Sequence, residues 1–362
     1  MALPKPRSDL SGFPPYRTPA QVKAEVRLAA NEWAEPNRAG TWLSAKELND
    51  VLLNRYPGPA LDLRAVLAGH YGVSADQLVL GNGSNEVLLG VFLVFGGHGR
   101  KTLLFQPTYS MHARLTLIAG GTAIDEMIGL PYDLRKEHAL AAMDRTRPEV
   151  VVFTTPNNPT GNTIDHEVIL AVAERYPETL VLVDEAYADF AGTTLIPEIE
   201  AHANLVISKT FSKVLAAVGL RVGVLIVHPD IAGYFTAAQL PYNVSTLTLA
   251  VAAKIARDET SVRRRIALAT AERERVYEAL RGVASIEVFP SVTNFILFRL
   301  RHGEPADAHA RFLEQSVLIR DISTWPGCER CLRASIGTPA ENDRFIAALD
   351  AVFAAPTAVR GA

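Results

Sequence analysis

This chain of 362 residues has few cysteines, no large excess of positive or negative charge, and no long apolar run. Each of these absences excludes a class of protein. Only two cysteines occur, Cys328 and Cys331, and this single C-x-x-C pair lacks the second pair or the nearby histidines that a zinc site needs. A thioredoxin-like redox motif is not indicated either, because the pair lies late in the chain within a Trp-Pro-Gly loop. We therefore interpret the cysteine spacing as coincidental and predict no metal site.

The charge balance and the hydropathy pattern exclude two further classes. Lys and Arg number 36 against 39 Asp and Glu, so no broad basic field is available for nucleic acid, and we interpret the run 263–265 as a solvated helix face. No apolar stretch reaches the roughly 18 residues of a membrane span, and residues 1–19 lack the apolar core of a secretory signal. The sequence predicts a cytoplasmic protein that binds neither nucleic acid nor membrane.

What the chain does contain is a regular alternation of short apolar runs with stretches of helical period. Its length exceeds what one hydrophobic core usually serves, which predicts two domains. Continuously apolar runs suit strands buried on both faces, and they indicate a mostly parallel sheet covered by helices, an α/β domain. The expected strands are 78–80, 102–105, 150–153, 180–183, 205–207 and 222–227.

The pattern changes after about residue 250 to mixed strands and helices, which predicts a small α+β domain. A helix over 251–280 is expected first, then strands at 286–289, 295–299, 317–320 and 332–336, and a final helix from Asn342. We predict an N-terminal arm, 1–40, that packs on the small domain or on a partner subunit. The large domain is predicted at 41–250 and the small C-terminal domain at 251–362.

Ligands of open α/β sheets bind at the carboxyl ends of the strands, so the residues that follow each apolar run are informative. The first run leads through a glycine turn into a helix start, where the free amides of Ser84 and Asn85 are expected to face an anion. A dinucleotide site is the competing interpretation. It is disfavoured because Glu86 replaces the third glycine of the fingerprint and no acidic residue stands between Glu86 and Asp125 to hold a ribose.

The other strand ends add an aromatic ring, an amide, a carboxylate, a lysine between hydroxyls and an arginine. The buried carboxylate, with no metal ligands nearby, needs a cationic partner. Pyridoxal phosphate requires this set, because its aldehyde binds a lysine amine, its ring nitrogen needs an acid partner, and its phosphate needs amides, hydroxyls and an arginine. The residues are Tyr109, Asn157, Asp184, Lys213 with Thr210 and Ser212, and Arg221.

These motifs resemble those of the fold type I pyridoxal-phosphate aminotransferases, and among them the histidinol-phosphate aminotransferase family, from about residue 28 to 345. The resemblance implies a large domain around a mostly parallel seven-stranded sheet, as in aspartate aminotransferase, plus the small α+β domain. The matching segments are 30–32, 55–57, 81–86, 107–111, 156–161, 184–187, 210–213, 219–223, 294–295, 319–321 and 332–333.

The resemblance also implies which residues hold the cofactor ring. Lys213 forms the Schiff base and moves the proton of the reaction, and Asp184 pairs with the pyridine nitrogen. Asn157 and Tyr187 reach the ring oxygen O3′, while Tyr109 stacks on the ring face.

For the anionic groups, the resemblance implies three sets of residues. The cofactor phosphate is expected on the Ser84 and Asn85 amides with Thr210, Ser212 and Arg221. Tyr56 reaches the phosphate in the partner subunit, so a homodimer with shared active sites is expected. The substrate residues are Arg333 for a carboxylate or distal anion, Arg320 for a substrate phosphate, Tyr16 on the arm, and Asn31; surface ion pairs are the alternative for the two arginines.

The predicted reaction is transamination between histidinol phosphate and 2-oxoglutarate in L-histidine biosynthesis. Aromatic amino-acid aminotransferases and threonine-phosphate decarboxylases share most of these motifs, and both remain alternatives. The decarboxylases also carry an Arg-Asp followed by a Pro-Gly loop, as Arg320-Asp321 and 325–327 do here. A non-catalytic module is disfavoured because Lys213 and Asp184 are present. Departures from the family pattern occur at Lys209, Asn85, Val218 and Trp33, and Trp33 is expected near the substrate mouth.

Overall fold

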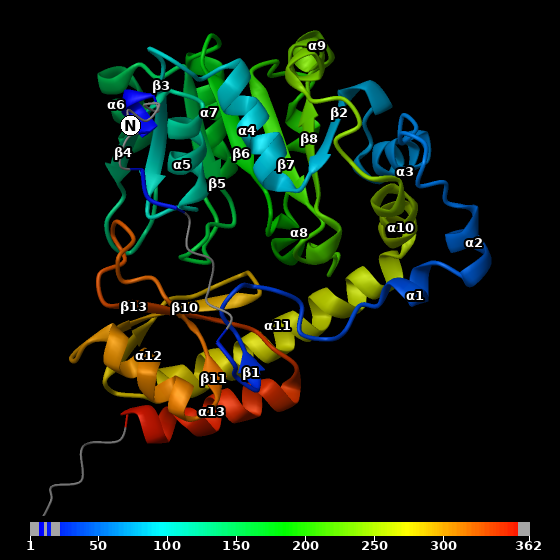
Figure 1. The fold of residues 1–362 in the computed structure, drawn as a ribbon. Coiled ribbons are helices and arrows are strands. Elements are labelled where there is room, and N and C mark those ends of the chain that lie inside the picture. The colour runs from blue at the N-terminus through cyan, green and yellow to red at the C-terminus, as the bar shows by residue number, and fades with distance from the viewer. Residues whose placement is uncertain (1–6, 11–12, 16–21, 354–362) are drawn as a thin grey trace, which may run out of the picture.

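The computed structural model describes residues 7–10, 13–15 and 22–353, and its largest element is a seven-stranded sheet with helices on both faces (Figure 1). The strand order is β2-β8-β7-β6-β5-β3-β4, and only β8 runs antiparallel to its neighbours, which are β2 and β7. The predicted mostly parallel α/β sheet is therefore confirmed. The strands are β2 (Leu78–Asn82), β3 (Lys101–Gln106), β4 (Thr122–Met127), β5 (Val150–Thr154), β6 (Leu180–Asp184), β7 (Leu205–Thr210) and β8 (Val222–Val227).

The continuous apolar runs have the expected cause, since alternate residues of one strand enter cores on opposite faces. In β5, Val151 and Phe153 belong to one core, whereas Val150 and Val152 belong to the other. Strand β4 was not predicted, because it is a half-exposed edge strand that contains Asp125 and Glu126 rather than an apolar run.

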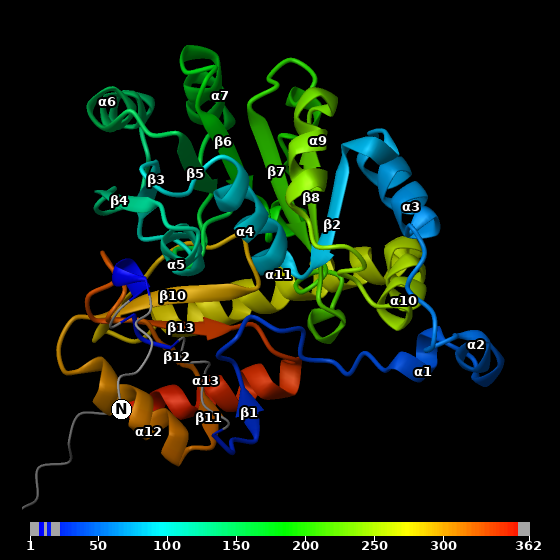
Figure 2. The same cartoon turned by 45° about the horizontal axis from the view of Figure 1, so that its top comes forward.

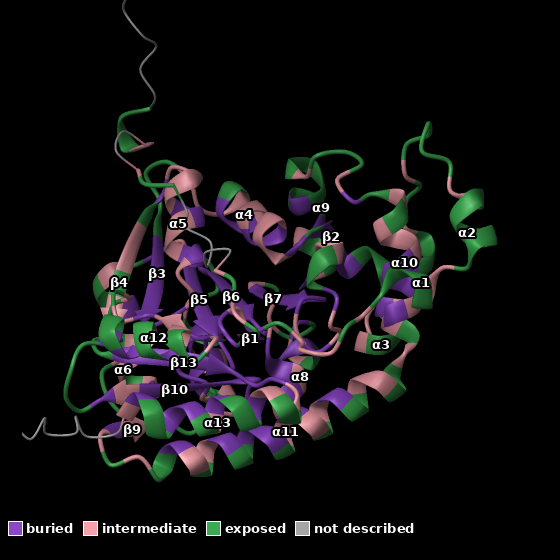
Figure 3. Cartoon of the chain, turned by 60° about the horizontal axis from the view of Figure 1, so that its bottom comes forward, coloured by how far each residue is buried: buried purple, intermediate pink, exposed green. Residues whose placement is uncertain are grey.

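Helices follow most strands and cover both faces of the sheet. Figure 3 shows buried strands in its interior, whereas the short helix α2 is exposed. The helices up to residue 257 are α1 (Ala39–Trp42), α2 (Ala45–Asp50), α3 (Leu61–Tyr71), α4 (Ser84–Val94), α5 (Met111–Ile118), α6 (Lys136–Thr146), α7 (His166–Arg175), α8 (Ala188–Ala191), α9 (Pro229–Ala238) and α10 (Thr246–Arg257). No helix within the described ranges is long and apolar enough to cross a membrane.

A second, antiparallel sheet of four strands lies below the first, and the long helix α11 packs against this second sheet and against α13 (Figures 1 and 2). Its core contains Phe298, Phe312 and Phe345. The strand order is β12 (Arg320–Asp321), β13 (Cys331–Ser335), β10 (Phe295–Leu300) and β9 (Ile286–Val288), and the helices are α11 (Glu259–Arg281), α12 (Pro305–Glu314) and α13 (Pro339–Phe353).

Two predicted elements of this region are divided. The helix expected over 251–280 is two helices, because Asp258 interrupts α10 and caps α11 by accepting a hydrogen bond from the Ser261 amide. The strand expected over 317–320 is split between two sheets. Its first half, β11 (Val317–Leu318), pairs in parallel with β1 (Val26–Arg27), and its second half is β12.

The N-terminal segment therefore contributes a strand beside the four-stranded sheet. Farther upstream, Arg114 of α5 donates to the Pro14 carbonyl at 2.9 Å and lies over the Phe13 ring. The division into an arm, a large domain and a small domain at residues 40 and 250 stays a prediction.

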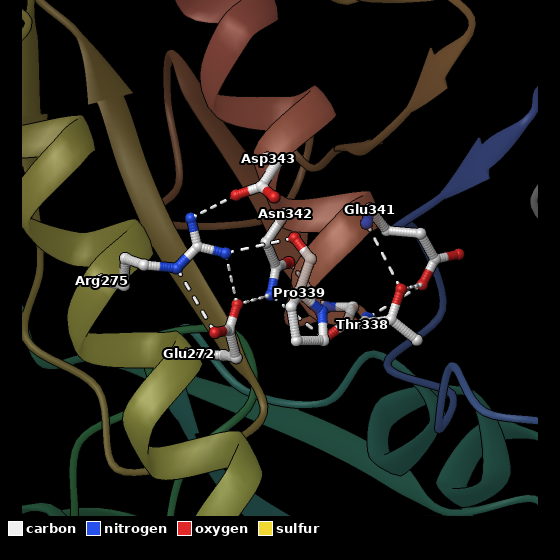
Figure 4. A network of polar contacts seen from close by, with 8 residues as sticks. Glu272, Arg275, Thr338, Pro339, Glu341, Asn342 and Asp343 are labelled. Atoms are coloured by element: carbon white, nitrogen blue, oxygen red, sulfur yellow. Dashed lines mark hydrogen bonds and ion pairs between the residues drawn. The ribbon is translucent and has the colours of Figure 1, made fainter.

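A buried polar network ties the last helix to α11 (Figure 4). The Glu272 carboxylate accepts hydrogen bonds from Arg275 at 2.6 Å and from the Asn342 side chain at 2.7 Å, and Arg275 also reaches Asp343. A buried carboxylate needs such partners, because desolvating it alone is costly. The network therefore holds the start of α13 against α11.

Candidate active site

A cavity of about 370 Å³ lies at the carboxyl ends of the parallel strands, facing the four-stranded sheet. It is lined by all but three of the residues that the sequence predicted for the site. The lining residues among those predicted are Asn31, Ser84, Asn85, Tyr109, Asp184, Tyr187, Thr210, Ser212, Lys213, Arg221, Arg320 and Arg333.

The sheet register explains why these side chains meet. Thr154, Asp184 and Ser208 are paired across β5, β6 and β7, so β5 and β6 end at the same level and β7 continues to Thr210 at the same edge of the sheet. Residues that follow these ends must emerge on the same edge. Residues about 130 positions apart in the sequence are thereby placed around one cavity.

Asp184 is buried at the base of this cavity, and both of its oxygens are held. Oδ1 accepts hydrogen bonds from the Ser208 hydroxyl at 3.1 Å and from the Ala186 amide at 3.2 Å. Oδ2 lies 3.1 Å from Nε2 of His112, a fully buried residue whose Nδ1 has no partner among the described residues. His112 was not predicted from the sequence, because a single histidine on an apolar helix face carries no signal of its own.

Among the described residues that line the cavity, Lys213 is the only one that carries an amine. Its Nζ donates to the backbone carbonyls of Ala30 and Asn31, at 3.3 and 3.2 Å. The same N-terminal segment is tied to both sheets, because the Asn31 side chain donates to the Tyr187 hydroxyl and accepts from Ser335.

An anion cradle forms where β2 turns into α4. A Cβ atom on Gly83, whose φ is +86°, would lie 2.2 Å from an Arg221 guanidinium nitrogen, and one on Gly223 would lie 2.4 Å from the Ser84 amide nitrogen. Only glycine at both positions lets the arginine and the helix N-terminus approach each other. Free amides at a helix start together with a guanidinium group suit a phosphate.

Arg320 and Arg333 are cross-strand neighbours in β12 and β13, and both face the cavity. Arg333 is buried and donates to the Asn158 side chain and to the Ala29 carbonyl, which contradicts the alternative of a surface ion pair. For Arg320, no ion pair forms with any residue in the described part of the chain.

The structure places Asn158, and not the predicted Asn157, in the cavity lining. The Asn157 side chain donates to the Pro107 carbonyl at 2.8 Å and to Thr160 at 2.7 Å, so it braces its own loop. Two neighbouring asparagines point in different directions, and the sequence contains no signal that selects one. The cavity position of Asn157 is thus corrected to Asn158.

Neither Tyr56 nor Trp33 lines the cavity. Tyr56 is exposed and stacks on Tyr242 with ring centroids 4.3 Å apart, outside this cavity, and its role at a partner's site stays a prediction. Tyr16 lies outside the described residues. Trp33 packs against the apolar cluster that contains Tyr187, and its indole donates to Glu35; its expected place near the substrate mouth stays a prediction.

Lys209, where the family pattern has arginine, lies buried behind the cavity. Its Nζ is 2.9 Å from Glu185 and 3.7 Å from Asp189. Burial alone would favour the neutral amine, but the two carboxylates outweigh it and hold the pKa of Lys209 above its ordinary value. The substitution therefore keeps a positive charge at this position.

No cluster of three or more His, Cys, Asp or Glu side chains within the described ranges is arranged to hold a metal ion. The cavity instead combines one carboxylate, one amine and three arginines.

Comparison with known proteins agrees with this geometry. The family model of aminotransferase class I and II matches residues 23–349. The chain is 37% identical over 355 residues to a histidinol-phosphate aminotransferase of Thermobifida fusca, covering 95% of this chain and 94% of that one. It is 32% identical over 337 residues to the enzyme of the same name from Chlorobaculum parvum, covering 91% and 93%.

Solved structures give the same fold. The histidinol-phosphate aminotransferase from Sinorhizobium meliloti in complex with pyridoxal-5′-phosphate superposes with a TM-score of 0.87 at 22% identity, covering 97% of this chain and 98% of that one. The L-threonine-O-3-phosphate decarboxylase from Porphyromonas gingivalis superposes with a TM-score of 0.79 at 25% identity, covering 90% and 98%.

Proposed function

The chain belongs to the class I and II aminotransferases, and from this premise we propose that it transfers an amino group between histidinol phosphate and 2-oxoglutarate in L-histidine biosynthesis. It is a transaminase that depends on pyridoxal phosphate. The observation that carries the choice of substrate is the paired arginines Arg320 and Arg333, which face the cavity opposite the Arg221 cradle.

The residues present fit the cofactor. The glycine-lined cradle of Arg221 and the Ser84 amide would hold its phosphate, and Asp184 would hold its ring nitrogen. Lys213 would bind its aldehyde carbon. Pyridoxal phosphate supplies an electron-withdrawing ring that stabilises negative charge on the substrate carbon bearing the amine.

The chain's own groups divide the remaining tasks. The Lys213 Nζ would hold the aldehyde carbon of the cofactor, and as a free amine it would take and return the proton at the substrate carbon. The Asp184 carboxylate holds a proton on a facing nitrogen, and Ser208 and His112 keep its two oxygens in place. Asn158 orients Arg333 through the hydrogen bond to its guanidinium group.

The charge of the cavity explains the substrate class. Three arginines and Lys213 surround a single carboxylate, so the cavity favours ligands with more than one anionic group. With Arg221 engaged by the cofactor phosphate, Arg320 and Arg333 remain for a substrate phosphate or for the carboxylates of glutamate and 2-oxoglutarate.

The test is a single-turnover titration of the cofactor-loaded protein with L-histidinol phosphate, L-phenylalanine and L-threonine phosphate in separate cuvettes. Fast conversion of the bound cofactor to its amino form by histidinol phosphate alone is expected. Faster conversion by phenylalanine would make the enzyme an aromatic transaminase, and release of carbon dioxide from threonine phosphate would make it a decarboxylase.

Replacing Asn158 by alanine is expected to lower kcat/KM for histidinol phosphate and glutamate by roughly 10- to 100-fold, since a hydrogen bond to a charged group is worth about 1.5–3 kcal/mol. Steady-state kinetics with both substrates would measure this loss. The matched variant Asn157→Ala removes the brace on the loop, so it is expected to lower thermal stability while leaving kcat/KM within a few-fold of normal. The reverse ranking of the two variants would restore Asn157 to the site.

An exposed apolar surface supports a further part of the proposal, a homodimer with shared active sites. We define the α2 patch as the exposed apolar side chains of α2, the following loop, the start of α3 and the segment after α9. A cluster of this kind marks a contact surface rather than a solvated face. Its members are Leu48, Leu52, Leu53, Tyr56, Leu61, Leu240 and Tyr242.

A charge in the α2 patch is therefore expected to dissociate the dimer. Leu53 is 81% exposed, so Leu53→Asp costs the isolated chain little but would desolvate a carboxylate in the interface. Analytical ultracentrifugation should show monomers, with weaker cofactor retention because Tyr56 no longer reaches the partner. Leu130→Asp, at the β4 edge of the sheet, is the matched control and should stay dimeric. A dimeric Leu53→Asp protein would contradict the placement of the interface.

We also propose a cytoplasmic location. The two cysteines are free thiols, the state that the cytosol maintains.

A further inference from the structure

The two cysteines, which the proposed function does not use, lie together where the loop after β12 meets β13: Cys328 is in the loop, and Cys331 is the first residue of β13. The Cys331 amide donates to the Cys328 carbonyl at 2.9 Å and closes a turn. Such a turn brings its end Cα atoms to within about 7 Å of each other, close to the range that a disulfide spans. The Cys331 thiol donates to the Glu329 carbonyl at 3.7 Å, and the two thiols are close enough for each to shift the pKa of the other. The spacing interpreted as coincidental in the sequence is therefore a preformed dithiol.

The surroundings make the two thiols unequal. Both are buried, with Tyr132, Phe289 and Ile322 around them, beneath the exposed residues Glu329 and Arg330 at the tip of the loop. The neighbouring Cys328 thiol lowers the pKa of Cys331 in spite of burial, with help from Tyr132 and the charge of Arg299, whereas the pKa of Cys328 is raised. Cys331 is thus the better nucleophile, and Cys328 keeps its proton.

The dithiol is connected to the cavity through its own loop. The Cys328 amide donates to the carbonyl of Trp325 at 3.0 Å, and Trp325 lines the cavity. The loop joins the two cavity arginines, since Arg320 precedes it and Arg333 follows Cys331 by two residues. A change in the conformation of this loop at the cysteines is therefore expected to shift three residues that line the cavity, namely Arg320, Trp325 and Arg333.

The same loop also rests on the seven-stranded sheet. The Tyr132 hydroxyl donates to the Gly327 carbonyl at 2.8 Å, and a Cβ atom on Gly327 would lie 3.0 Å from Met127 and 3.2 Å from Pro107. Because there is so little free space at Gly327, the loop cannot shift toward the seven-stranded sheet when a covalent bond forms at Cys328. The loop is expected to move on its cavity side instead, at Trp325.

We propose that Cys328 and Cys331 form a redox modification site, in which hydrogen peroxide converts the dithiol to a disulfide and the modified loop weakens substrate binding through Trp325. The Cys331 thiolate attacks one peroxide oxygen, the O–O bond breaks, and sulfenic acid and hydroxide form. The Cys328 sulfur then attacks the Cys331 sulfur, the S–O bond breaks, and the leaving hydroxyl departs as water with the Cys328 proton. Two electrons from the thiols reduce one peroxide to two waters, and a dithiol reductant reverses the modification.

The test uses the cofactor-loaded protein, and its chemical readout is independent of the proposed function. Because the chain has only two cysteines, thiol titration and peptide mass analysis report on this pair alone. After peroxide, both free thiols should be lost to one disulfide within the tryptic fragments of this loop, and dithiothreitol should restore them. Persisting thiols, or sulfinic acid in place of the disulfide, would overturn the modification site.

The kinetic readout rests on the proposed function. Oxidation is expected to raise KM for histidinol phosphate roughly 3- to 10-fold, about 0.7–1.4 kcal/mol, with kcat and cofactor content nearly unchanged. The double variant Cys328→Ser/Cys331→Ser should show normal KM and no response to peroxide. A disulfide that leaves KM unchanged would overturn the link to Trp325, and a variant that still responds would assign the effect to another residue. Failure of histidinol phosphate to react in the reduced protein would instead reject the proposed function, and the thiol readout would still decide this inference.

Discussion

Lys213→Ala is expected to lower turnover by about 10⁴-fold or more, the largest effect of any single change in this chain. No other described residue that lines the cavity carries an amine, so the variant loses the covalent attachment of the cofactor and the base together. The fold should be kept, because Nζ donates only to the carbonyls of Ala30 and Asn31 among the described residues, and the Asn31 carbonyl also accepts a hydrogen bond from the Asn294 side chain at 3.2 Å.

Borohydride reduction followed by peptide mass analysis tests this expectation directly. In the wild-type protein the cofactor should be fixed to the peptide that contains Lys213, and in the variant it should wash out. Lys136→Ala, which removes an exposed lysine of α6, is the matched control and should retain both turnover and the fixed cofactor. Substantial turnover of Lys213→Ala, or cofactor fixed to a different lysine, would reject the role of Lys213.

Asp184→Ala is expected to leave the cofactor bound while lowering turnover by about 10³-fold. The phosphate cradle of Arg221 and the Ser84 amide is untouched by this change, so affinity falls little. The rate falls because no other carboxylate lines the cavity to keep a facing ring nitrogen protonated, and electrostatic stabilisation of this kind is worth several kcal/mol in a buried site.

Asp184→Asn separates charge from shape. The amide can keep the hydrogen bond from Ser208 at 3.1 Å but cannot stabilise a cation, so its rate should resemble that of the alanine variant. Equilibrium dialysis for the cofactor and stopped-flow measurement of the first half-reaction give the two quantities. Asp144→Ala, at an exposed ion pair with Arg175, is the control for loss of a carboxylate. Near-normal rates in both Asp184 variants would remove its assigned role.

Much of the site was predictable because it follows strand ends. Asp184, Thr210 and Arg221 come directly after or before apolar runs, and parallel strands ending at one level bring such residues together whatever their distance in the sequence. The need for glycine at positions 83 and 223 is explained only by the tertiary structure. Arg221 and the Ser84 amide occupy the space that side chains at these two positions would fill.

The residues that were missed or misplaced share a different property. Their roles depend on the direction in which the side chain points, and not on the position of the residue along the sequence. The choice between Asn157 and Asn158 depends on which side chain meets Arg333. His112 gains meaning only because α5 packs it against Asp184. Strand β4 escaped prediction because an exposed edge has no apolar period, and the break at Asp258 depends on a cap.

The sequence by itself determined the α/β class, the cofactor and the order of the residues that hold it. Strands buried on both faces appear as continuous apolar runs, and the polar residues at the strand ends directly follow these runs, so both can be recognised from short segments of sequence. Only the tertiary structure decided which asparagine faces Arg333, what holds Asp184, and that Cys328 and Cys331 form a dithiol beside the cavity. These contacts join elements that are distant in the chain, and their geometry arises from packing, which no local pattern encodes.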